Sequence, residues 1–187
     1  ENLEDCIGTV QASGAEIGVA FDGDADRIGV VDRDGRIIWG DHILILYARD
    51  VLARTGAGQP IIFDVKCSQA LMDGIEKAGG VPVMWKTGHS LIKDKMKELH
   101  APIAGEMSGH MFFTESFYGH DDALYAAARL LRIIANSGMR LDELLADVPP
   151  FVSTPELRID TDEESKFAIV ARAATHFKAT HEVIEVD

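Results

Sequence analysis

The chain has 187 residues and a formal net charge of −13, with 47% hydrophobic and 26% charged residues. This composition predicts a globular, soluble chain that buries a core, and no stretch reaches the roughly 18 apolar residues that a membrane helix needs. The acidic balance argues against nucleic acid or an anionic membrane as the main partner, because both attract basic surfaces.

The cysteine content and the first residues bear on the compartment. Cys6 and Cys67 are the two cysteines, and neither belongs to a CxxC pair or a Cys/His array. A zinc site or a disulfide framework is therefore not expected, and a reducing cytoplasm fits best. Residues 1–5 are acidic where a secretory signal is basic, so no signal peptide is expected. The chain starts at Glu1 rather than at methionine, which suggests a piece of a longer protein.

The first part of the chain predicts strands and then a helix. Short apolar runs rich in β-forming residues, and then apolar residues at helical spacing, predict strands at 17–21, 28–32 and 37–39 and a helix over 43–52. Asp34-Gly35 is the turn signal between the last two strands. Asp41 is the expected N-cap of the helix, and Gly56 ends it.

The middle of the chain alternates between the two periodicities. The expected elements are strands at 60–65, 81–85, 102–104 and 111–113 and helices over 68–78 and 90–99, with a further helix that ends near 136. Asp121 or Asp122 caps that last helix. The βαβα order predicts an α/β fold, a three-layer α/β/α domain with a mixed, mainly parallel sheet. Ligands of such sheets bind at loops that follow the strands.

The composition changes after Leu144. Pro149, Pro150 and Pro155 break the helical periodicity and mark a linker. Beyond it, the pattern predicts a strand at 156–159, a helix over 163–177 and a strand at 183–186. This tail is too small to form an independent core, so it is expected to begin another domain.

The acidic loop, Asp22 to Arg27, places three alternating carboxylates directly after a buried strand. Such close carboxylates repel one another unless a divalent cation neutralises them, and Mg2+ prefers carboxylate and phosphate oxygens. Arg27 suggests that a phosphate shares the site, since guanidinium binds phosphate oxygens in a planar fork. Asp22, Asp24 and Asp26 are thus the expected metal ligands.

The acidic loop has three other interpretations: an EF-hand, a phosphatase nucleophile loop and a plain surface turn. An EF-hand needs Gly at its sixth position and Glu at its twelfth, where Arg27 and Arg33 stand. A dehalogenase-type phosphatase, with Asp22 as nucleophile, stays open as an alternative. A solvated acidic turn is the plain structural interpretation, and the density of carboxylates after a buried strand argues against it.

Two further strand ends carry polar side chains. The lysine loop, Asp64 to Ser68, contains Lys66, whose plain interpretation is an ordinary surface lysine. The histidine loop, Lys86 to Ser90, places hydroxyls and His89 beside the amides of a helix N-terminus, which suits an anion or a sugar. Simple helix capping and a surface position for His89 remain the structural alternatives.

The glutamate loop, Gly105 to His110, holds a carboxylate, a hydroxyl and an imidazole between two glycines. Glu106 and Ser108 suit neighbouring sugar hydroxyls, because a hydroxyl donates to one group and accepts from the other. His110 can move protons near neutral pH. A hydrolase triad is a weak alternative, since Glu106 stands where a G-x-S-x-G elbow needs glycine.

Taken together, these loops resemble those of the α-D-phosphohexomutases, specifically the bacterial phosphomannomutase/phosphoglucomutase group. The most specific motifs are DGDADR at 22–27 and GEMSGH at 105–110, and DVKCS at 64–68 and YGHDDALYAAARLL at 118–131 extend the resemblance over nearly the whole chain. The resemblance implies an enzyme that moves phosphate between O1 and O6 of a hexose such as mannose or glucose. The reaction runs through a phosphoserine and a bisphosphorylated intermediate.

The resemblance also implies roles for individual residues. Asp22, Asp24 and Asp26 bind Mg2+ together with an oxygen of the phosphoserine, and Arg27 lies beside the transferring group. The substrate-binding residues are Lys66, His89, Glu106, Ser108 and His110, and Arg27 and His110 are the catalytic pair. Phosphoryl transfer depends mostly on positioning and charge neutralisation, which agrees with these residue types.

The chain departs from the family pattern at Ala25 and in the loops that it lacks, and Met107 bears on the substrate within the family. Ala25 stands where the family more often has glycine, which costs stability only if the residue needs a positive φ. Met107 favours glucose or mannose phosphates, because glucosamine mutases commonly carry Gln there. The phosphoserine loop and the loop that grips the substrate phosphate are missing, so these residues alone are expected to be inactive and to bind Mg2+ weakly.

The resemblance finally predicts a division of the chain. Residues 1–36 form the C-terminal part of a second α/β domain with the metal loop, 37–150 a complete third domain with the sugar loop, and 151–187 the start of a C-terminal domain. The expected partners are a hexose phosphate and the missing domains of the same polypeptide. A non-catalytic sugar-phosphate binding module remains a further alternative.

Overall fold

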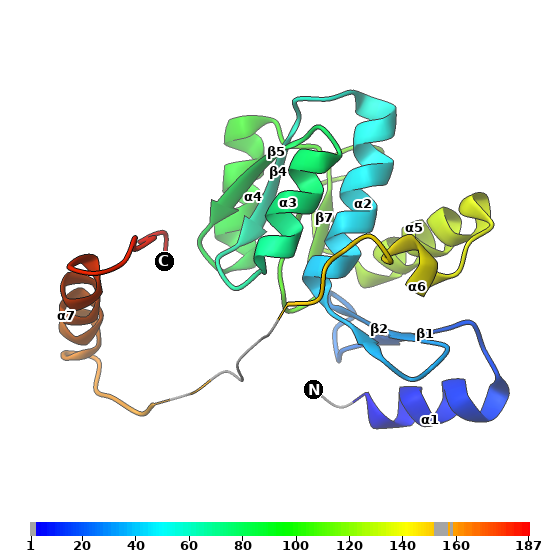
Figure 1. The fold of residues 1–187 in the computed structure, drawn as a ribbon, viewed down its shortest axis with the longest axis horizontal. Helices are drawn as coiled ribbons and strands as arrows, with labels where there is room; N and C mark the ends of the chain where they lie inside the picture. The colour runs from blue at the N-terminus through cyan, green and yellow to red at the C-terminus, as the bar shows by residue number, and fades with distance from the viewer. Residues whose placement is uncertain (1–2, 152–156, 158) are drawn as a thin grey trace. The chain divides into compact units, whose positions relative to one another are not determined.

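The computed structural model describes residues 3–151, 157 and 159–187, and the chain forms two compact units, Glu1–Pro150 and Phe151–Asp187. Within the first unit, a small sheet comes first in the chain. Its strands β1 (Ile17–Phe21), β2 (Ile28–Asp32) and β3 (Ile37–Ile38) are antiparallel and lie in that order. Helix α1 (Glu4–Ser13) packs against β1 and β2 (Figure 1). The strands expected at 17–21 and 28–32 are confirmed, and the acidic loop joins them.

The second sheet forms the centre of the first unit. Its four strands lie in the order β5, β4, β6, β7, and their bounds are β4 Pro60–Asp64, β5 Val81–Trp85, β6 Ile103–Gly105 and β7 Met111–Phe113. Strand β4 is parallel to β5 and β6, whereas β7 is antiparallel to β6. The expectation of a mixed, mainly parallel sheet is confirmed.

Helices cover both faces of this sheet (Figure 1). The remaining helices of the unit are α2 Gly40–Thr55, α3 Gln69–Lys77, α4 His89–Leu99, α5 Ala123–Ser137 and α6 Leu141–Leu144. Side chains of β4 alternate between the faces, because successive strand residues point to opposite sides. Phe63 belongs to the core beneath α2 and α3, and Ile62 packs with Ile92 and Met96 of α4. The predicted three-layer α/β/α domain is thus confirmed.

The expected N-cap of α2 was wrong. The helix begins at Gly40, and Trp39 is its N-cap residue without a side-chain hydrogen bond. Asp41 is instead buried in the first turn, where its carboxylate accepts the Ser68 amide at 3.3 Å. Gly40 passes so close to the glutamate loop that a Cβ there would lie 2.5 Å from the Glu106 carbonyl oxygen. The first turn of helix α2 therefore packs against both the glutamate loop and the lysine loop.

The second unit, taken by itself, contains helix α7 (Lys166–Lys178), and none of its residues is buried. The expected helix is confirmed, although it starts later than 163. The expected strand at 183–186 was wrong, and that at 156–159 lies partly outside the described residues. An isolated strand leaves its backbone groups without a neighbouring strand to pair with, which explains why 183–186 does not form one. In the described part of the whole chain, no helix is long and apolar enough to cross a bilayer.

Candidate functional site

The acidic loop brings its three carboxylates together. One oxygen of each of Asp22, Asp24 and Asp26 lies within 4.8 Å of the others. Arg27 holds Asp22 from both sides, since its backbone amide donates to Oδ1 at 3.1 Å and its Nε donates to Oδ2 at 2.6 Å. Desolvation raises the pKa of Asp22, but these hydrogen bonds and the charge of Arg27 outweigh it and hold the pKa below its usual value.

The carboxylates suit a hard divalent cation. The donors are oxygens in a cluster of three, and Oδ1 of Asp26 is buried without a hydrogen-bond partner among the described residues. A buried carboxylate oxygen without a donor is costly, and a bound cation would remove that cost. The chemistry of the loop therefore fits Mg2+ better than it fits a plain surface turn.

Ala25 has a positive φ, the condition under which an alanine in place of glycine costs stability. Its φ is +61°, in the left-handed region that side chains with a Cβ disfavour. The turn is fixed on both sides, because the Ala25 amide donates to the Asp22 carbonyl at 3.2 Å and its own carbonyl accepts the Ala123 amide at 3.0 Å. The loop thus carries backbone strain beside the carboxylates.

The glutamate loop connects β6 to β7 and buries its carboxylate. Glu106 is 2% exposed, its Oε1 accepts the Gly88 amide at 2.7 Å, and its Oε2 lies 2.7 Å from Nδ1 of His110. The hydroxyl of Ser108 lies 3.4 Å from the same Oε2. Gly109 closes the turn at a φ of +100°, where a Cβ would lie 2.5 Å from the Ile28 carbonyl oxygen.

Glu106 and His110 form a pair in which both pKa values are shifted. Burial raises the pKa of Glu106, but hydrogen bonds from His110 and the Gly88 amide outweigh it and hold the pKa below its usual value. Burial lowers the pKa of His110, but the hydrogen bond and charge of Glu106, with the charge of Asp26, outweigh it and raise the pKa. The pair therefore favours a carboxylate beside an imidazolium.

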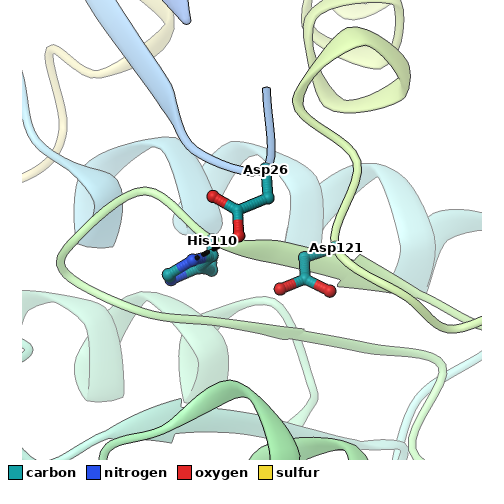
Figure 2. A group of neighbouring side chains, drawn as sticks. All are labelled: Asp26, His110 and Asp121. Carbon is teal, nitrogen blue, oxygen red and sulfur yellow. Dashed lines mark ion pairs between the residues drawn. The ribbon is translucent and has the colours of Figure 1, made fainter. Parts of the chain in front are cut away.

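His110 joins the acidic and glutamate loops. Its Nε2 lies 3.3 Å from Oδ2 of Asp26, on the side of the ring opposite Glu106. The backbones meet at the same place, since the Ile28 amide donates to the Gly109 carbonyl at 3.2 Å. Figure 2 shows the carboxylates of Asp26 and Asp121 on neighbouring sides of the imidazole. The two loops, far apart in sequence, thus form one polar surface.

Lys66 and His89 lie at neighbouring strand ends. The ring centroids of His89 and His110 are 6.4 Å apart, and His89 is exposed. The Lys66 ammonium lies 3.9 Å from Oδ2 of the buried Asp64. The structure therefore gathers the lysine, histidine and glutamate loops at the carboxyl ends of β4, β5 and β6.

Three residues near the site had no assigned part in it from the sequence. Asp64 is the fully buried last residue of β4. Asp121 can form a ligand group with Asp26 and His110, and it pairs with Lys93 at 3.1 Å, whereas Asp122 is the cap of α5. A charged residue that ends an apolar strand was the available signal for Asp64. For Asp121 and Lys93, no sequence signal distinguished a site residue from a helix cap and a residue of a solvated helix face.

The fold and the site define an α/β/α domain with polar loops at its strand ends and a carboxylate cluster suited to a cation. Comparison with protein-family models matches residues 39–151 to the phosphoglucomutase/phosphomannomutase alpha/beta/alpha domain III and residues 1–35 to domain II of the same proteins. The chain belongs to the phosphoglucomutase/phosphomannomutase family, within the α-D-phosphohexomutases.

Individual relatives agree with this assignment. The chain is 53% identical to a phosphomannomutase/phosphoglucomutase of Pseudomonas putida over 91% of its length, and 48% identical to a phosphoglucomutase of Neisseria gonorrhoeae over 100% of its length. It spans 36% and 41% of those proteins. A crystal structure of a family member from Burkholderia thailandensis has a TM-score of 0.88 and 49% identity, and the match covers 100% of this chain and 39% of that one.

Proposed function

We propose that this chain is the metal-binding and sugar-binding part of a phosphohexomutase that interconverts the 1-phosphate and 6-phosphate of mannose or glucose. The reaction uses a phosphoserine and a bisphosphorylated intermediate, and it takes place in the cytoplasm. The 187 residues by themselves bind substrate weakly and do not turn over. Family membership and the names of the relatives support the reaction class.

The junction at His110 is the observation that carries the proposal. The imidazole spans from Glu106 of the glutamate loop to Asp26 of the acidic loop. A phosphohexomutase needs its phosphoryl-transfer centre and its sugar-binding groups within the length of one hexose phosphate. Direct contact between the two loops supports such an arrangement.

Asp22, Asp24 and Asp26 would hold Mg2+, in keeping with their clustered oxygens. When bound, the ion supplies neutralisation of the charge on the phosphoryl oxygens. The proposed division of the chain at 36–37 and 150–151 places these ligands in the second domain of the longer protein. It places the sugar-binding groups in the third.

The side chains of this chain have distinct proposed roles. Arg27 pairs with phosphoryl oxygens through the guanidinium nitrogens that do not hold Asp22. Nδ1 of His110 is hydrogen-bonded to Glu106, so the proton exchanged with the reacting sugar hydroxyl is that of Nε2, which lies 3.3 Å from Asp26 and turns from that carboxylate to the substrate. Glu106 and Ser108 bind sugar hydroxyls.

Lys66 and His89 complete the proposed pocket. Both are exposed at strand ends beside the glutamate loop, so both are open to a ligand. Lys66 supplies positive charge for a substrate phosphate in a chain whose net charge is −13. His89 contributes a hydrogen bond to the same ligand.

The phosphatase alternative is not favoured. It requires Asp22 as a free nucleophile, but both oxygens of that carboxylate accept hydrogen bonds from Arg27. The alternative also gives the glutamate loop no part. The remaining alternative is a non-catalytic binding module made of the 187 residues alone. A binding module requires tight binding of a sugar phosphate by these residues, whereas part of an enzyme requires only weak binding.

An activity assay tests the proposal. The full-length protein is incubated with glucose 1-phosphate, Mg2+ and a hexose bisphosphate activator, and glucose 6-phosphate is measured. We expect sustained formation with the full-length protein and none with the 187-residue chain. Absence of activity in the full-length protein with mannose and glucose phosphates contradicts the proposed reaction, and turnover by the short chain contradicts its inactivity.

Calorimetry separates the binding module from the enzyme part. Mannose 1-phosphate is titrated into the 187-residue chain in the presence of Mg2+. We expect weak binding, because part of the proposed pocket belongs to other domains. Micromolar affinity of the isolated chain favours a dedicated binding module instead.

A further inference from the structure

Asp64 is a buried carboxylate that the proposed mechanism does not use. It is the last residue of β4 and is fully buried. Strand β4 lies between β5 and β6, so its carboxyl end is central among the loops that carry the proposed substrate-binding residues. A buried carboxylate is unfavourable unless several donors surround it. Its partners therefore indicate what it is for.

The donors to Asp64 come from three different loops. Oδ1 accepts the Met107 amide of the glutamate loop at 2.9 Å and the Cys67 thiol of the lysine loop at 3.0 Å. Oδ2 accepts the Thr87 hydroxyl of the histidine loop at 3.4 Å and lies 3.9 Å from the Lys66 ammonium. One side chain thus connects all three loops at the carboxyl ends of β4, β5 and β6.

The thiol is a dependable donor in this arrangement. Burial raises the pKa of Cys67 well above its usual value, and the charge of Asp64 raises it further. Cys67 therefore keeps its proton and donates it to the carboxylate. The contact explains why a buried cysteine, rather than an alanine, fits at this point of the lysine loop.

The charge of Asp64 matters more than its shape. A neutral amide could still accept the Met107 amide, but it would not attract the ammonium of Lys66. Hydrogen bonds to an ionised acceptor are also stronger than those to a neutral one. The negative charge thus restrains a flexible, half-exposed lysine at the edge of the proposed pocket.

We propose that Asp64 is a positioning residue for substrate: its buried charge holds Lys66 and the glutamate loop in the geometry that binds the hexose phosphate. Asp64 itself does not touch substrate. This inference rests on the proposed function, because it assigns Asp64 a role in that same site. Loss of the charge weakens substrate binding in the ground state and in the transition state alike, which raises KM and leaves kcat nearly unchanged.

The test compares Asp64→Asn with a matched control in the full-length protein. Asp32 is also buried, at 2% exposure, and it holds the turn before β3 through Arg36 and two backbone amides. We expect Asp64→Asn to raise KM for glucose 1-phosphate about tenfold with kcat within about threefold. Asp32→Asn is expected to lower stability without changing KM. A KM for Asp64→Asn within twofold of the parent overturns the proposal.

A double-mutant cycle with Lys66→Met tests the route of the effect. Since Asp64 acts partly through Lys66, the double variant is expected to raise KM by clearly less than the product of the two single effects. Fully multiplicative effects overturn the assignment of Lys66 as the group that Asp64 positions. A solely structural carboxylate would give no such coupling in KM.

Hydrogen exchange in the 187-residue chain gives a readout that does not depend on catalysis. Asp64→Asn is expected to speed exchange of the Met107 amide severalfold relative to that of core amides in β4. Unchanged exchange at Met107 overturns the proposal even if the protein is active. If exchange at Met107 is faster but the full-length protein lacks mutase activity, Asp64 does hold the glutamate loop and the proposed function is wrong.

A second variant covers the case in which Asp64→Asn does not fold. Cys67→Ala removes one donor and keeps the carboxylate. We expect a two- to threefold rise in KM and faster exchange at the Met107 amide. The reason is that Oδ1 of Asp64, which accepts that amide, loses the hydrogen bond from the Cys67 thiol. Parent-like KM and exchange in Cys67→Ala overturn the proposal.

Discussion

The glutamate loop and the acidic loop meet at His110, yet they are held in different ways. The carboxylate of Glu106 is buried and accepts a backbone amide from another loop. The carboxylates of the acidic loop are partly or fully exposed; Arg27 of the same loop donates to Asp22, and Asp26 lies against the imidazole of His110. The protein thus fixes the proposed sugar-binding groups in advance, whereas the acidic loop retains free oxygens for an ion.

The two loops also differ in how they turn. The glutamate loop uses Gly109 at its positive φ, while the acidic loop uses Ala25. A glycine at such a position has no Cβ to strain, and an alanine does. The glutamate loop thus turns without strain and is held by its contacts with its neighbours, whereas the acidic loop tolerates strain in a conformation suited to cation binding.

The largest expected effect comes from Glu106→Ala, which removes the anchor of the glutamate loop. The Gly88 amide and Nδ1 of His110 lose their acceptor, so we expect a loss of about 2–3 kcal/mol in the free energy of unfolding. Mutase activity of the full-length protein should fall by roughly 100-fold or more in kcat/KM. Urea denaturation and steady-state kinetics measure the two effects.

The exposed Glu76 of α3 provides the control for that change. Glu76→Ala should stay within about 0.5 kcal/mol of the parent, as surface substitutions usually do. If Glu106→Ala is as mild as Glu76→Ala, the glutamate loop is not anchored by its carboxylate, and the contrast between the two loops fails.

The next effect concerns the acidic loop. Asp26→Asn should weaken binding of Mg2+ or Mn2+ at least tenfold, on the scale of losses that follow removal of groups around a metal. The folding free energy should change less than in Glu106→Ala, because the acidic loop contributes little buried hydrogen bonding. Competition between Mn2+ and Mg2+, followed by electron paramagnetic resonance, measures the affinity.

Asp34→Asn is the matched control, since it changes an exposed aspartate in a neighbouring turn. It should leave cation affinity unchanged. Equal affinities in the parent and Asp26→Asn would show that the cation does not use this carboxylate. A tight Mg2+ site in the parent chain would contradict the expectation that further ligands come from outside these residues.

A smaller effect is expected at the strained alanine. Ala25→Gly should raise the free energy of unfolding by about 0.5–1 kcal/mol, because relief of the left-handed strain exceeds the added chain entropy of glycine. Ala128→Gly, at an exposed position inside α5, should lower it by about 1 kcal/mol. Opposite signs for the same substitution confirm the strain, and a loss at both positions contradicts it.

The smallest expected effect is a pH dependence of stability at Asp41 and His42, next to the lysine loop. Burial raises the pKa of Asp41, but hydrogen bonds from His42 and Ser68 outweigh it and lower the pKa. The hydrogen bond to Asp41 raises the pKa of His42. The His42 contribution is full below pH 6.5 and declines as pH rises through its raised pKa, while the Asp41 contribution is full above pH 3.8 and declines below it.

The pair should therefore stabilise the fold most between pH 3.8 and 6.5. His42→Gln removes the titrating ring, so the difference in unfolding free energy between parent and variant should shrink as pH rises above 6.5. Urea denaturation at several pH values measures it. A difference that grows toward alkaline pH would contradict the assigned ion pair.

The sequence was sufficient for the layers of the first unit and for the content of its loops. Apolar runs and helical spacing placed β1, β2, β4 and β5 correctly, because burial of one face imposes a period on the sequence. The strand prediction for the last residues of the chain was wrong. Residues 183–186 have a strand-like composition, but a strand forms only where another strand offers hydrogen bonds.

The same limit applied to the site. The motifs DGDADR and GEMSGH marked the residues of both loops, and their resemblance to those of the α-D-phosphohexomutases indicated the family, which was then confirmed. The assigned roles of those residues stay predictions. The pairing of groups came from the folded chain, in which Asp26 meets His110 and Asp64 meets three loops. The contact of Asp64 with Met107 joins residues 43 positions apart, and that of Asp26 with His110 joins residues 84 positions apart. Local sequence patterns carry no information about such pairs, because the sheet order and the packing of α2 bring them together.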